Sequence, residues 1–292
     1  MKIAIYGRPT NDNTSEHIQL LFHTLNEYTS ELFIHEPFYH FLQQKLKINT
    51  SIQTFNSHND IKNKVDYMLS LGGDGTFLET LSFVRDSGIP ILGINTGRLG
   101  FLSNVAKTEV NAALEALNKK KYSIEKRALL SVAAPPNLFG EVNYGLNELT
   151  ILKKDSSAMI TIHTYVNNDY LNSYFADGLI IATPTGSTAY SLSCGGPLVM
   201  PGSENFVITP IAPHNLNVRP LVISDSNVIT LKVEGRSSHY LVSLDSRSEV
   251  IDASIELTIK KANFYANLIQ LENQNFFNTL RNKLLWGLDK RN

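Results

Sequence analysis

The sequence predicts an α/β protein in which an N-terminal Rossmann-like domain with a parallel sheet is followed by a C-terminal all-β domain. Over residues 1–100, short apolar runs alternate with longer amphipathic stretches, the pattern of a parallel sheet covered by helices. From Ser123 onward short β-rich runs dominate. Helical spacing returns at Gln274–Leu288. We therefore expect an α/β domain at residues 1–100, a β-rich domain at 101–270 and a C-terminal helix within 271–292 that packs on the first domain.

The elements of the first domain follow from the spacing of apolar side chains. Short apolar runs predict strands, and apolar residues three or four positions apart predict helices. The predicted strands are Lys2–Tyr6, Val65–Leu71 and Pro90–Ile94, and the predicted helices are Ser15–Tyr28, Phe77–Ser87 and a short one at Asp60-Ile61. Lys107–Lys120 is a further predicted helix, because Val110, Ala113, Leu114 and Leu117 fall on one face.

The second domain is a series of β-rich runs. The predicted strands are Leu129–Ala133, Leu149–Leu152, Met159–Val166, Leu179–Ala182, Phe206–Ile211, Val228–Val233, Tyr240–Leu244 and Ile255–Ile259. Asn167-Asn168 separates two alternating runs and indicates a hairpin turn. Because no Pro-rich or Ser-rich linker divides the halves, we expect the two domains to pack closely.

Composition restricts the class of protein. A formal net charge of -1 provides no general attraction for nucleic acid or for acidic membranes, so we expect neither as a partner. Apolar stretches stay shorter than the roughly 18 residues of a membrane span. The single Cys194 cannot form an internal disulfide, which favours a reducing compartment and makes the cytoplasm the expected location.

A glycine loop carries the first sign of chemistry. Gly72–Thr76, with the sequence Gly-Gly-Asp-Gly-Thr, directly follows an apolar strand and opens a helix. Glycines there let backbone N–H groups approach a phosphate, and a helix N-terminus favours an anion. Asp74 is unusual because a carboxylate repels phosphate. It suits metal binding, acceptance of a hydroxyl proton or a hydrogen bond to ribose; alternatively, Asp74 caps its own helix in a tight turn.

This loop resembles the signature shared by NAD kinases, by diacylglycerol and sphingosine kinases and, more loosely, by 6-phosphofructokinases. These enzymes all phosphorylate a hydroxyl, so the loop indicates a reaction and not a substrate. Three further segments resemble the NAD kinase family: Gly93–Leu102, Asn147-Glu148 and Asp177–Pro197. The resemblance spans about residues 1–270. It implies that ATP phosphorylates the 2′-hydroxyl of the adenosine ribose of NAD, giving NADP and ADP.

Two of these segments also have a chemical interpretation of their own. Thr183–Thr188 places hydroxyls and a proline after the apolar run Leu179–Ala182, which suits a phosphorylated or polyhydroxylated ligand. The alternative is a hydroxyl-rich turn that caps a short helix. Asn147-Glu148 offers acceptors and an amide for ribose hydroxyls or an adenine edge, and its alternative is a solvated strand end.

The resemblance implies a role for each matching residue. Asp74 is the catalytic residue that accepts the proton of the 2′-hydroxyl. Gly72, Gly73 and Gly75 lie along phosphates, with Mg²⁺ held mainly by ATP and no metal ligands assigned to the protein. The NAD-binding residues are Asn147 and Glu148 for the adenosine part, Asp177 for the nicotinamide end, and Thr188, Ala189, Tyr190, Ser191, Leu192 and Ser193 for ribose and adenine. The family also implies a homodimer or homotetramer.

The chain departs from the family pattern at two places. Glu79 stands where family members often carry a basic residue, so one phosphate contact must come from elsewhere. Asp245-Ser246-Arg247 replaces the commoner Asp-Gly-Gln. We hypothesise that Arg247 reaches a phosphate or ribose and compensates in part for Glu79.

Two other functions compete with this interpretation. A lipid or sugar kinase would use the same glycine loop, but Asn147-Glu148 and Thr183–Ser193 favour a dinucleotide. A catalytically silent NAD-binding regulator would keep the pocket and lose turnover. The intact Asp74 argues against a silent protein, whereas Glu79 argues slightly for one.

Overall fold

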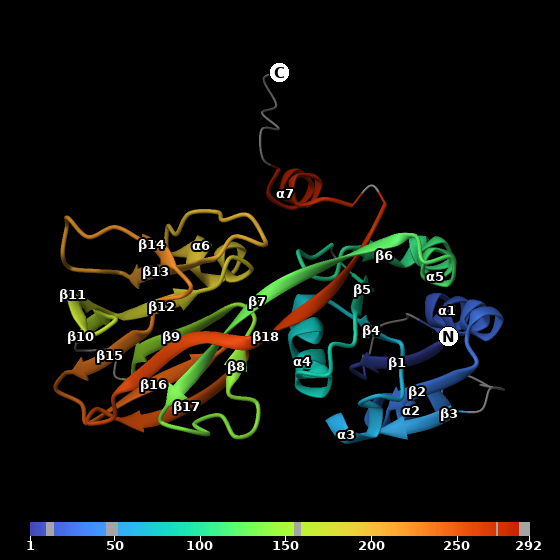
Figure 1. The fold of residues 1–292 in the computed structure, drawn as a ribbon, viewed down its shortest axis with the longest axis horizontal. Helices are drawn as coiled ribbons and strands as arrows, with labels where there is room; N and C mark the ends of the chain where they lie inside the picture. Colours follow the sequence, from blue (N-terminus) through green and yellow to red (C-terminus); the bar gives the residue numbers. More distant parts are fainter. Residues whose placement is uncertain (10–14, 45–51, 98, 155–158, 273, 286–292) are drawn as a thin grey trace, which may run out of the picture. The chain divides into compact units, whose positions relative to one another are not determined.

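The computed structural model describes residues 1–9, 15–44, 52–97, 99–154, 159–272 and 274–285 (Figure 1). The chain divides into two compact units. The first contains Met1–Lys126 and the chain from Ala266 onward, and the second contains Arg127–Tyr265. The first is built on a parallel sheet and the second on antiparallel strands, which confirms the predicted fold class.

The sheet of the first unit has the order β3-β2-β1-β4-β5-β18. Its strands are β1 (Lys2–Gly7), β2 (Glu31–His35), β3 (Ile52–Phe55), β4 (Tyr67–Leu71), β5 (Ile91–Asn95) and the end of β18 (Leu257–Leu271), and neighbouring strands run parallel. Strands β4 and β5 are buried along their whole length, as expected when helices cover both faces of a parallel sheet. In the register, Leu71 lies opposite both Gly7 and Ile94, so the segments that follow β1, β4 and β5 emerge at one edge.

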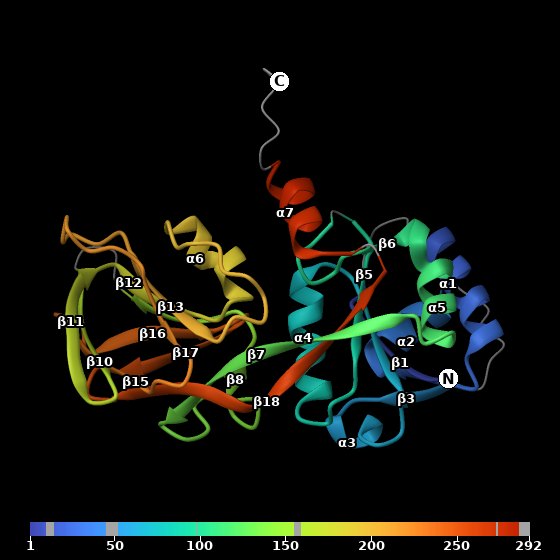
Figure 2. The same cartoon turned by 45° about the horizontal axis from the view of Figure 1, so that its top comes forward.

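Helices cover both faces of this sheet. Helix α4 (Asp74–Val84) lies on one face, whereas α1 (Ser15–Tyr28) and α5 (Val110–Asn118) lie side by side on the other (Figures 1 and 2). Two short helices, α2 (Glu36–Gln43) and α3 (His58–Ile61), complete the connections before α4. A 3-10 turn (Lys107–Glu109) and the short strand β6 (Val105–Ala106) precede α5.

The predicted strands and helices of the first unit are confirmed, but β2, α2, β3 and the two-residue strand β6 were not predicted. Strand β2 passes directly into α2 at Glu36, without the glycine or loop that normally separates two periodicities. Helix α4 begins at Asp74 instead of Phe77, because Gly73 is its N-cap in an extended conformation. Asp74 is therefore the first residue of the helix.

The second unit consists of antiparallel strands in two groups. One sheet has the order β14-β13-β12-β9-β16-β17, and strands β11-β10-β15-β18 with β7 and β8 form the other group. Apolar side chains from both groups make one core. The strands are β7 (Tyr122–Ala134), β8 (Tyr144–Gly145), β9 (Glu148–Lys153), β10 (Ile160–Val166), β11 (Asp169–Ala176), β12 (Gly178–Ala182), β13 (Asn205–Ile211), β14 (Leu221–Ser224), β15 (Ile229–Glu234), β16 (His239–Leu244) and β17 (Arg247–Asp252).

The predicted hairpin is confirmed, because Asn167 and Asn168 both have positive φ, 52° and 71°, and join β10 to β11. Strands β14 and β17 were not predicted. Most of their residues are exposed, so no run of apolar side chains announces them. Strand β18 extends to Leu271, well past the predicted end at Ile259.

Residues 101–126 lie in the first unit, whereas the sequence placed the start of the second domain near residue 100. The reason is α5, whose side chains Val110, Leu114 and Leu117 are buried in the core that Leu21 and Leu25 of α1 also share. A boundary before α5 would expose this face.

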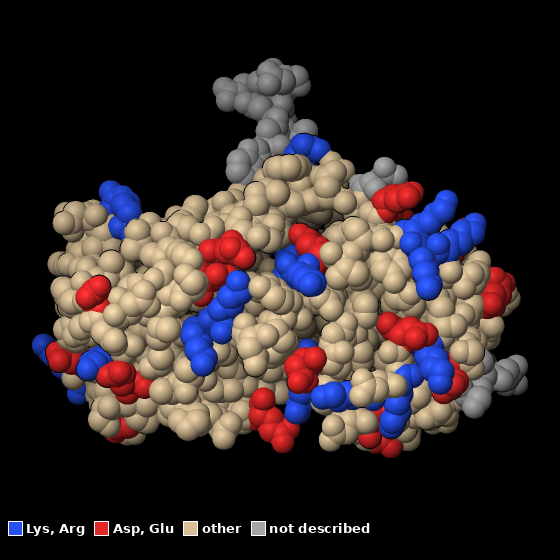
Figure 3. Space-filling model, in the orientation of Figure 1, with Lys and Arg blue, Asp and Glu red and all other residues tan. Residues whose placement is uncertain are grey.

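The terminal helix is α7 (Phe276–Leu284), which ends at Leu285 in the left-handed conformation. It is shorter than the predicted Gln274–Leu288, and positions 286–288 lie outside the described residues. Within the described part of the chain, no helix combines the length and the apolar character needed to cross a membrane. On the face drawn in Figure 3, acidic and basic side chains are interspersed, in keeping with the net charge of -1.

Because Leu114 is completely buried between α5 and the sheet, Leu114→Ala should lower the free energy of unfolding by roughly 2–5 kcal/mol. Urea titration followed by circular dichroism measures this loss. Glu115→Ala, on the exposed face of the same helix, is the matched control and should unfold close to the wild type. Equal unfolding midpoints for Leu114→Ala and wild type would show that α5 is not part of the core.

Candidate active site

The glycine loop lies at the carboxyl end of β4 and has a backbone that only glycine fits at its first position. Gly72 has φ 153°, and a Cβ there would lie 2.4 Å from Oγ1 of Thr76. At Gly73 and Gly75 an added Cβ would meet nothing within 4 Å, so this side of the loop is open. The N–H groups of Asp74 and Gly75, which open the helix, precede its first i→i−4 hydrogen bond and have no intrahelical acceptor. The loop therefore has backbone N–H donors next to open space at Gly73 and Gly75.

The carboxylate of Asp74 turns away from its own helix toward the loop after β5. Its Oδ2 accepts a hydrogen bond from Phe101 N at 2.9 Å, and its Oδ1 accepts bonds from Leu102 N and Ser103 N, both at 3.0 Å. The ammonium of Lys283 lies 3.3 Å from Oδ2. The side chain of Asp74 stays 28% exposed. The interpretation of Asp74 as a helix cap is therefore wrong, and the carboxylate joins two loops.

Gly100 and Gly93 make this contact possible. A Cβ at Gly100 would lie only 1.9 Å from Oδ1 of Asp74, and a Cβ at Gly93 would lie 2.6 Å from the carbonyl oxygen of Leu102. Asn95 closes the same loop by accepting from Gly97 N at 2.6 Å. Gly93 and Gly100 are thus needed because the backbone and a carboxylate approach one another closely there.

Lys283 comes from α7, far along the sequence, and was not predicted as a site residue. Its ammonium lies 4.9 Å from the centre of the Phe101 ring, and Phe101 also contacts Phe276 with ring centres 6.4 Å apart. Sequence spacing identified only the apolar face of this helix, so nothing in it marked the lysine.

The carboxylate of Glu79 contacts one cation and one hydroxyl donor. Its carboxylate forms an ion pair with the guanidinium of Arg8, and Tyr6 donates its hydroxyl to Oε2 at 2.8 Å. Burial alone would raise the pKa of Glu79, but the hydrogen bonds from Arg8 and Tyr6 outweigh it and lower the pKa. Arg8 directly follows β1. The acidic residue at position 79 of α4 is therefore paired with an arginine that follows β1.

In the second unit, the Asn147-Glu148 pair is held by Asp245. The Asp245 carboxylate accepts hydrogen bonds from Leu146 N and Asn147 N, both at 2.8 Å, and from Glu148 N at 3.2 Å. Asp245 has φ 52° in the turn between β16 and β17, a conformation that Asp tolerates better than most residues. This turn fixes the backbone from which Asn147 and Glu148 project.

Glu148 lies in an environment that favours its protonated form. Burial and then the negative charge of Asp245 raise the pKa of Glu148 to about 8, although a hydrogen bond from the backbone N–H of Tyr190 opposes the shift. Its Oε2 is buried and has no hydrogen-bond partner among the described residues. The side chain can therefore offer a proton near neutral pH.

The segment from Thr183 to Tyr190 packs directly on Asn147. Thr183 N donates to the carbonyl oxygen of Asn147 at 2.9 Å, and a Cβ at Gly186 would lie 2.0 Å from that oxygen. A 3-10 turn (Gly186–Thr188) and the one-turn helix α6 (Tyr190–Ser193) follow. The structure thus brings together the two segments that the sequence separated by about 40 residues.

The predicted binding residues of this segment differ in exposure. Tyr190 is 40% exposed, whereas Ser191 is fully buried and exchanges a 2.8 Å hydrogen bond with Thr209. Thr188 donates its hydroxyl to the carbonyl oxygen of Thr185 at 3.1 Å. The remaining predicted positions are Ala189 and Leu192, which are partly buried, and Ser193, which is exposed. Tyr190 therefore presents the largest accessible surface of this group.

Asp177 and Arg247 lie at other points of the second unit. Asp177, before β12, forms an ion pair with Lys153 at 2.6 Å. Burial, followed by the charges of Cys194 and Asp177, raises the pKa of Tyr190. The guanidinium of Arg247 donates to the carbonyl oxygens of Val142 and Tyr144. Arg247 therefore holds a backbone segment.

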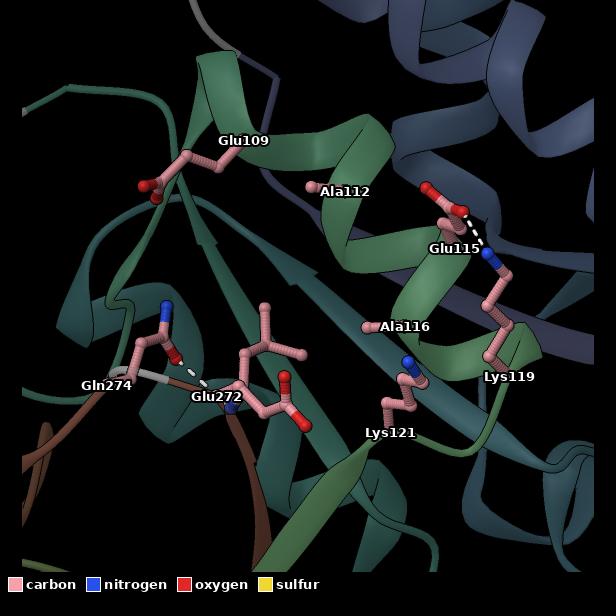
Figure 4. A pocket seen from close by; sticks show the side chains of 9 residues that line it. Glu109, Ala112, Glu115, Ala116, Lys119, Lys121, Glu272 and Gln274 are labelled. Atoms are coloured by element: carbon pink, nitrogen blue, oxygen red, sulfur yellow. Dashed lines mark hydrogen bonds and ion pairs between the residues drawn. The ribbon is translucent and has the colours of Figure 1, made fainter.

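A cavity of about 430 Å³ lies elsewhere in the first unit, between α5 and the chain that follows β18 (Figure 4). Its lining includes Glu109, Glu115, Lys119, Lys121 and Glu272, and none of the predicted site residues. Among the described residues there is also no group of three or more His, Cys, Asp or Glu side chains placed to bind a metal ion.

A glycine loop that presents a carboxylate at the carboxyl edge of a parallel sheet places phosphate-binding backbone donors beside a proton acceptor, an arrangement that suits a phosphotransferase. Comparison with known proteins specifies it further. Residues 3–122 match the ATP-NAD kinase N-terminal domain, and residues 146–271 match the ATP-NAD kinase C-terminal domain. The chain belongs to the ATP-NAD kinase family.

Named relatives and solved structures agree with this membership. The chain is 51% identical to the NAD kinase of Flavobacterium psychrophilum and 46% identical to that of Cytophaga hutchinsonii, in each case over 100% of both chains. The NAD kinase from Archaeoglobus fulgidus in complex with ATP is similar at 28% identity and a TM-score of 0.72, covering 97% of this chain and 99% of that one. Yeast NADH kinase complexed with NADH shares the fold, at 24% identity and a TM-score of 0.88, over 99% and 89%.

Gly100→Ala should displace the Asp74 carboxylate, because a methyl group cannot lie 1.9 Å from its Oδ1. We expect phosphoryl transfer to fall on the order of 100-fold, while circular dichroism and the melting temperature change little. Gly97→Ala, in the same loop, is the matched control, because a Cβ there would meet nothing within 4 Å. Wild-type turnover in Gly100→Ala would contradict the geometry described for Asp74.

Glu148 should make stability depend on pH. Its pKa of about 8 in the folded protein lies above the ordinary glutamate pKa of 4.5, so the stability it contributes is present below pH 4.5 and is lost as pH rises through about 8. Between pH 4.5 and 8, the free energy of unfolding of Glu148→Gln should therefore fall by a few kcal/mol less than that of the wild type. Urea unfolding at several pH values measures it, with the exposed Glu249→Gln as control. Identical pH dependences for wild type and Glu148→Gln would refute a proton held on Glu148.

Proposed function

We propose that this chain is an NAD kinase, which transfers the γ-phosphoryl group of ATP to the 2′-hydroxyl of the adenosine ribose of NAD and releases NADP and ADP. One observation carries the proposal: the carboxylate of Asp74 is fixed by three backbone N–H groups beside a glycine loop that opens onto free space. The family membership of both units and the NAD kinase names of the relatives support the substrate.

Asp74 acts as the proton acceptor. The 2′-oxygen attacks the γ-phosphorus while its proton passes to Oδ2 of Asp74, and the bond between the γ-phosphorus and the leaving ADP oxygen breaks. In a loose transition state the proton can be transferred late, so alignment matters more than the strength of the base. The hydrogen bonds from Phe101, Leu102 and Ser103 supply that alignment, because they leave the carboxylate a single orientation.

The glycine loop binds phosphates through its backbone. Gly73 and Gly75 have open space where a side chain would stand, and Gly72 permits the turn before them. A divalent cation, which we propose to be Mg²⁺, neutralises charge on the phosphates when it is bound. Mg²⁺ commonly keeps several waters and binds substrate phosphates. Most of its ligands would therefore come from ATP and water.

The second unit recognises NAD. Asn147 and Glu148 bind the adenosine ribose, and a protonated Glu148 can donate one hydrogen bond and accept another, which suits neighbouring hydroxyls. The accessible ring of Tyr190 packs against adenine or ribose, together with Thr188, Ala189, Ser191, Leu192 and Ser193 of the same segment. Asp177 interacts with the nicotinamide end. Arg247 acts indirectly, by holding the segment that leads to Asn147.

The chain forms a homodimer or homotetramer in the cytoplasm. The four-residue edge strand β14 exposes Leu221 and Val222, and Leu216 before it is 90% exposed, which supports association through the second unit. Cys194 is a free thiol, which supports a reducing compartment.

The proposal is tested by incubating purified protein with NAD, ATP and Mg²⁺ and measuring NADP with an NADP-specific dehydrogenase. The wild type should form NADP, and Asp74→Asn should reduce turnover on the order of 100-fold or more, because the acceptor is lost. Asp86→Asn changes a 59% exposed carboxylate of the same unit and serves as control. No NADP from folded wild type, or full turnover in Asp74→Asn, would overturn the proposal.

A further inference from the structure

The terminal helix α7 is fastened to the loop that holds Asp74. The Phe276 ring contacts Phe101, and Gln274 donates its side-chain amide to the carbonyl oxygen of Asn104 at 3.3 Å. Leu280, in the middle of the helix, is buried. Lys283 follows Leu280 by three positions and therefore lies near the same face. The helix thus delivers an ammonium to Asp74 from a docked position.

The acceptor sites of Asp74 show what this ammonium does. A carboxylate has about four lone-pair sites. Three are used by the backbone N–H groups of Phe101, Leu102 and Ser103, and the fourth faces Lys283 at 3.3 Å. A substrate hydroxyl that binds Asp74 must therefore take this fourth site at Oδ2, which Lys283 occupies in the free enzyme. The ammonium then lies beside the reacting hydroxyl.

A cation beside the glycine loop would stabilise the negative charge of a bound phosphoryl group. Phosphoryl transfer depends on neutralising the charge of the transferred group, and lysine binds phosphate well as a point charge. The position on α4 where the family often has a basic residue is Glu79, and its carboxylate pairs with Arg8. Lys283 differs from Arg8 because its partner is the reacting carboxylate itself, and its side chain is 34% exposed.

From this geometry we infer that Lys283 is a further catalytic residue, which holds Oδ2 of Asp74 in the free enzyme and contacts an oxygen of the transferred phosphoryl group during the reaction. When the substrate hydroxyl takes the fourth site of Asp74, the ammonium donates to the phosphoryl oxygen instead. The proton of the hydroxyl passes to Asp74, so no proton is transferred from Lys283. The inference rests on the proposed NAD kinase activity and adds a residue from the terminal helix to that site.

The test compares Lys283→Ala, Lys283→Met and Lys283→Arg with wild type in the NADP assay. Removing the ammonium should lower kcat on the order of 100-fold, with the KM for NAD within about twofold of wild type. Lys283→Met keeps the aliphatic stem over Phe101 and should be as slow as Lys283→Ala, whereas Lys283→Arg should recover part of the rate. Added ethylamine should partly restore Lys283→Ala, which a merely structural role would not allow.

Arg281→Ala is the matched control. It removes a cation from the same helix, where Arg281 donates only to Asn278 among the contacts that the structure gives it, and it should leave kcat unchanged. An unchanged or higher kcat in Lys283→Ala, an equal loss in Arg281→Ala, or a loss that neither ethylamine nor Lys283→Arg relieves would overturn the inference. Each of these results leaves the wild-type activity intact, so failure of Lys283 is distinguishable from failure of the proposed function.

Discussion

The arrangement of the first unit depends on the hydrogen bonds between the Asp74 carboxylate and the backbone of residues 101–103. A carboxylate beside a phosphate-binding loop is repelled by its ligand unless donors hold it in place. Three N–H groups in succession provide that hold, and they come from the segment that follows β5, not from α4. The loops after two adjacent parallel strands are therefore tied together by one side chain, at the edge where ligands of such sheets bind.

The second unit contains a similar arrangement, in which an aspartate fixes a backbone segment. Asp245 also accepts three successive backbone N–H groups, from residues 146–148, and so fixes the start of β9. Asp245 serves as a support, because Glu148 projects from the segment that it holds. Its negative charge also contributes to the raised pKa of Glu148. Asp245 thus fixes the position of Glu148 and, after burial, contributes to its raised pKa.

Local sequence predicted the parts of the fold and site that local chemistry determines. The glycine loop, the 93–102 segment and Asn147-Glu148 were found because glycines and polar pairs stand out after apolar strands. Strand β2 was missed because it passes directly into α2, and β3 because only two of its four residues, Ile52 and Phe55, are apolar. Lys283 was missed because 209 positions separate it from Asp74. The close contact of Gly100 with Asp74 also required coordinates, since spacing cannot tell which glycine faces a side chain. These features depend on tertiary contacts, which local sequence patterns do not reveal.

The contrast between Asp74 and Glu148 explains how one chain can use two carboxyl groups in different ways. Asp74 faces three N–H donors and an ammonium, surroundings that suit an acceptor of a proton or a hydrogen bond. Glu148 has a buried oxygen without a partner among the described residues and a second carboxylate nearby, surroundings that keep a proton on it. An aspartate and a glutamate are chemically almost the same. Their surroundings differ because three backbone N–H groups and an ammonium face Asp74, whereas Glu148 is buried, lies near the charge of Asp245 and accepts a backbone hydrogen bond from Tyr190.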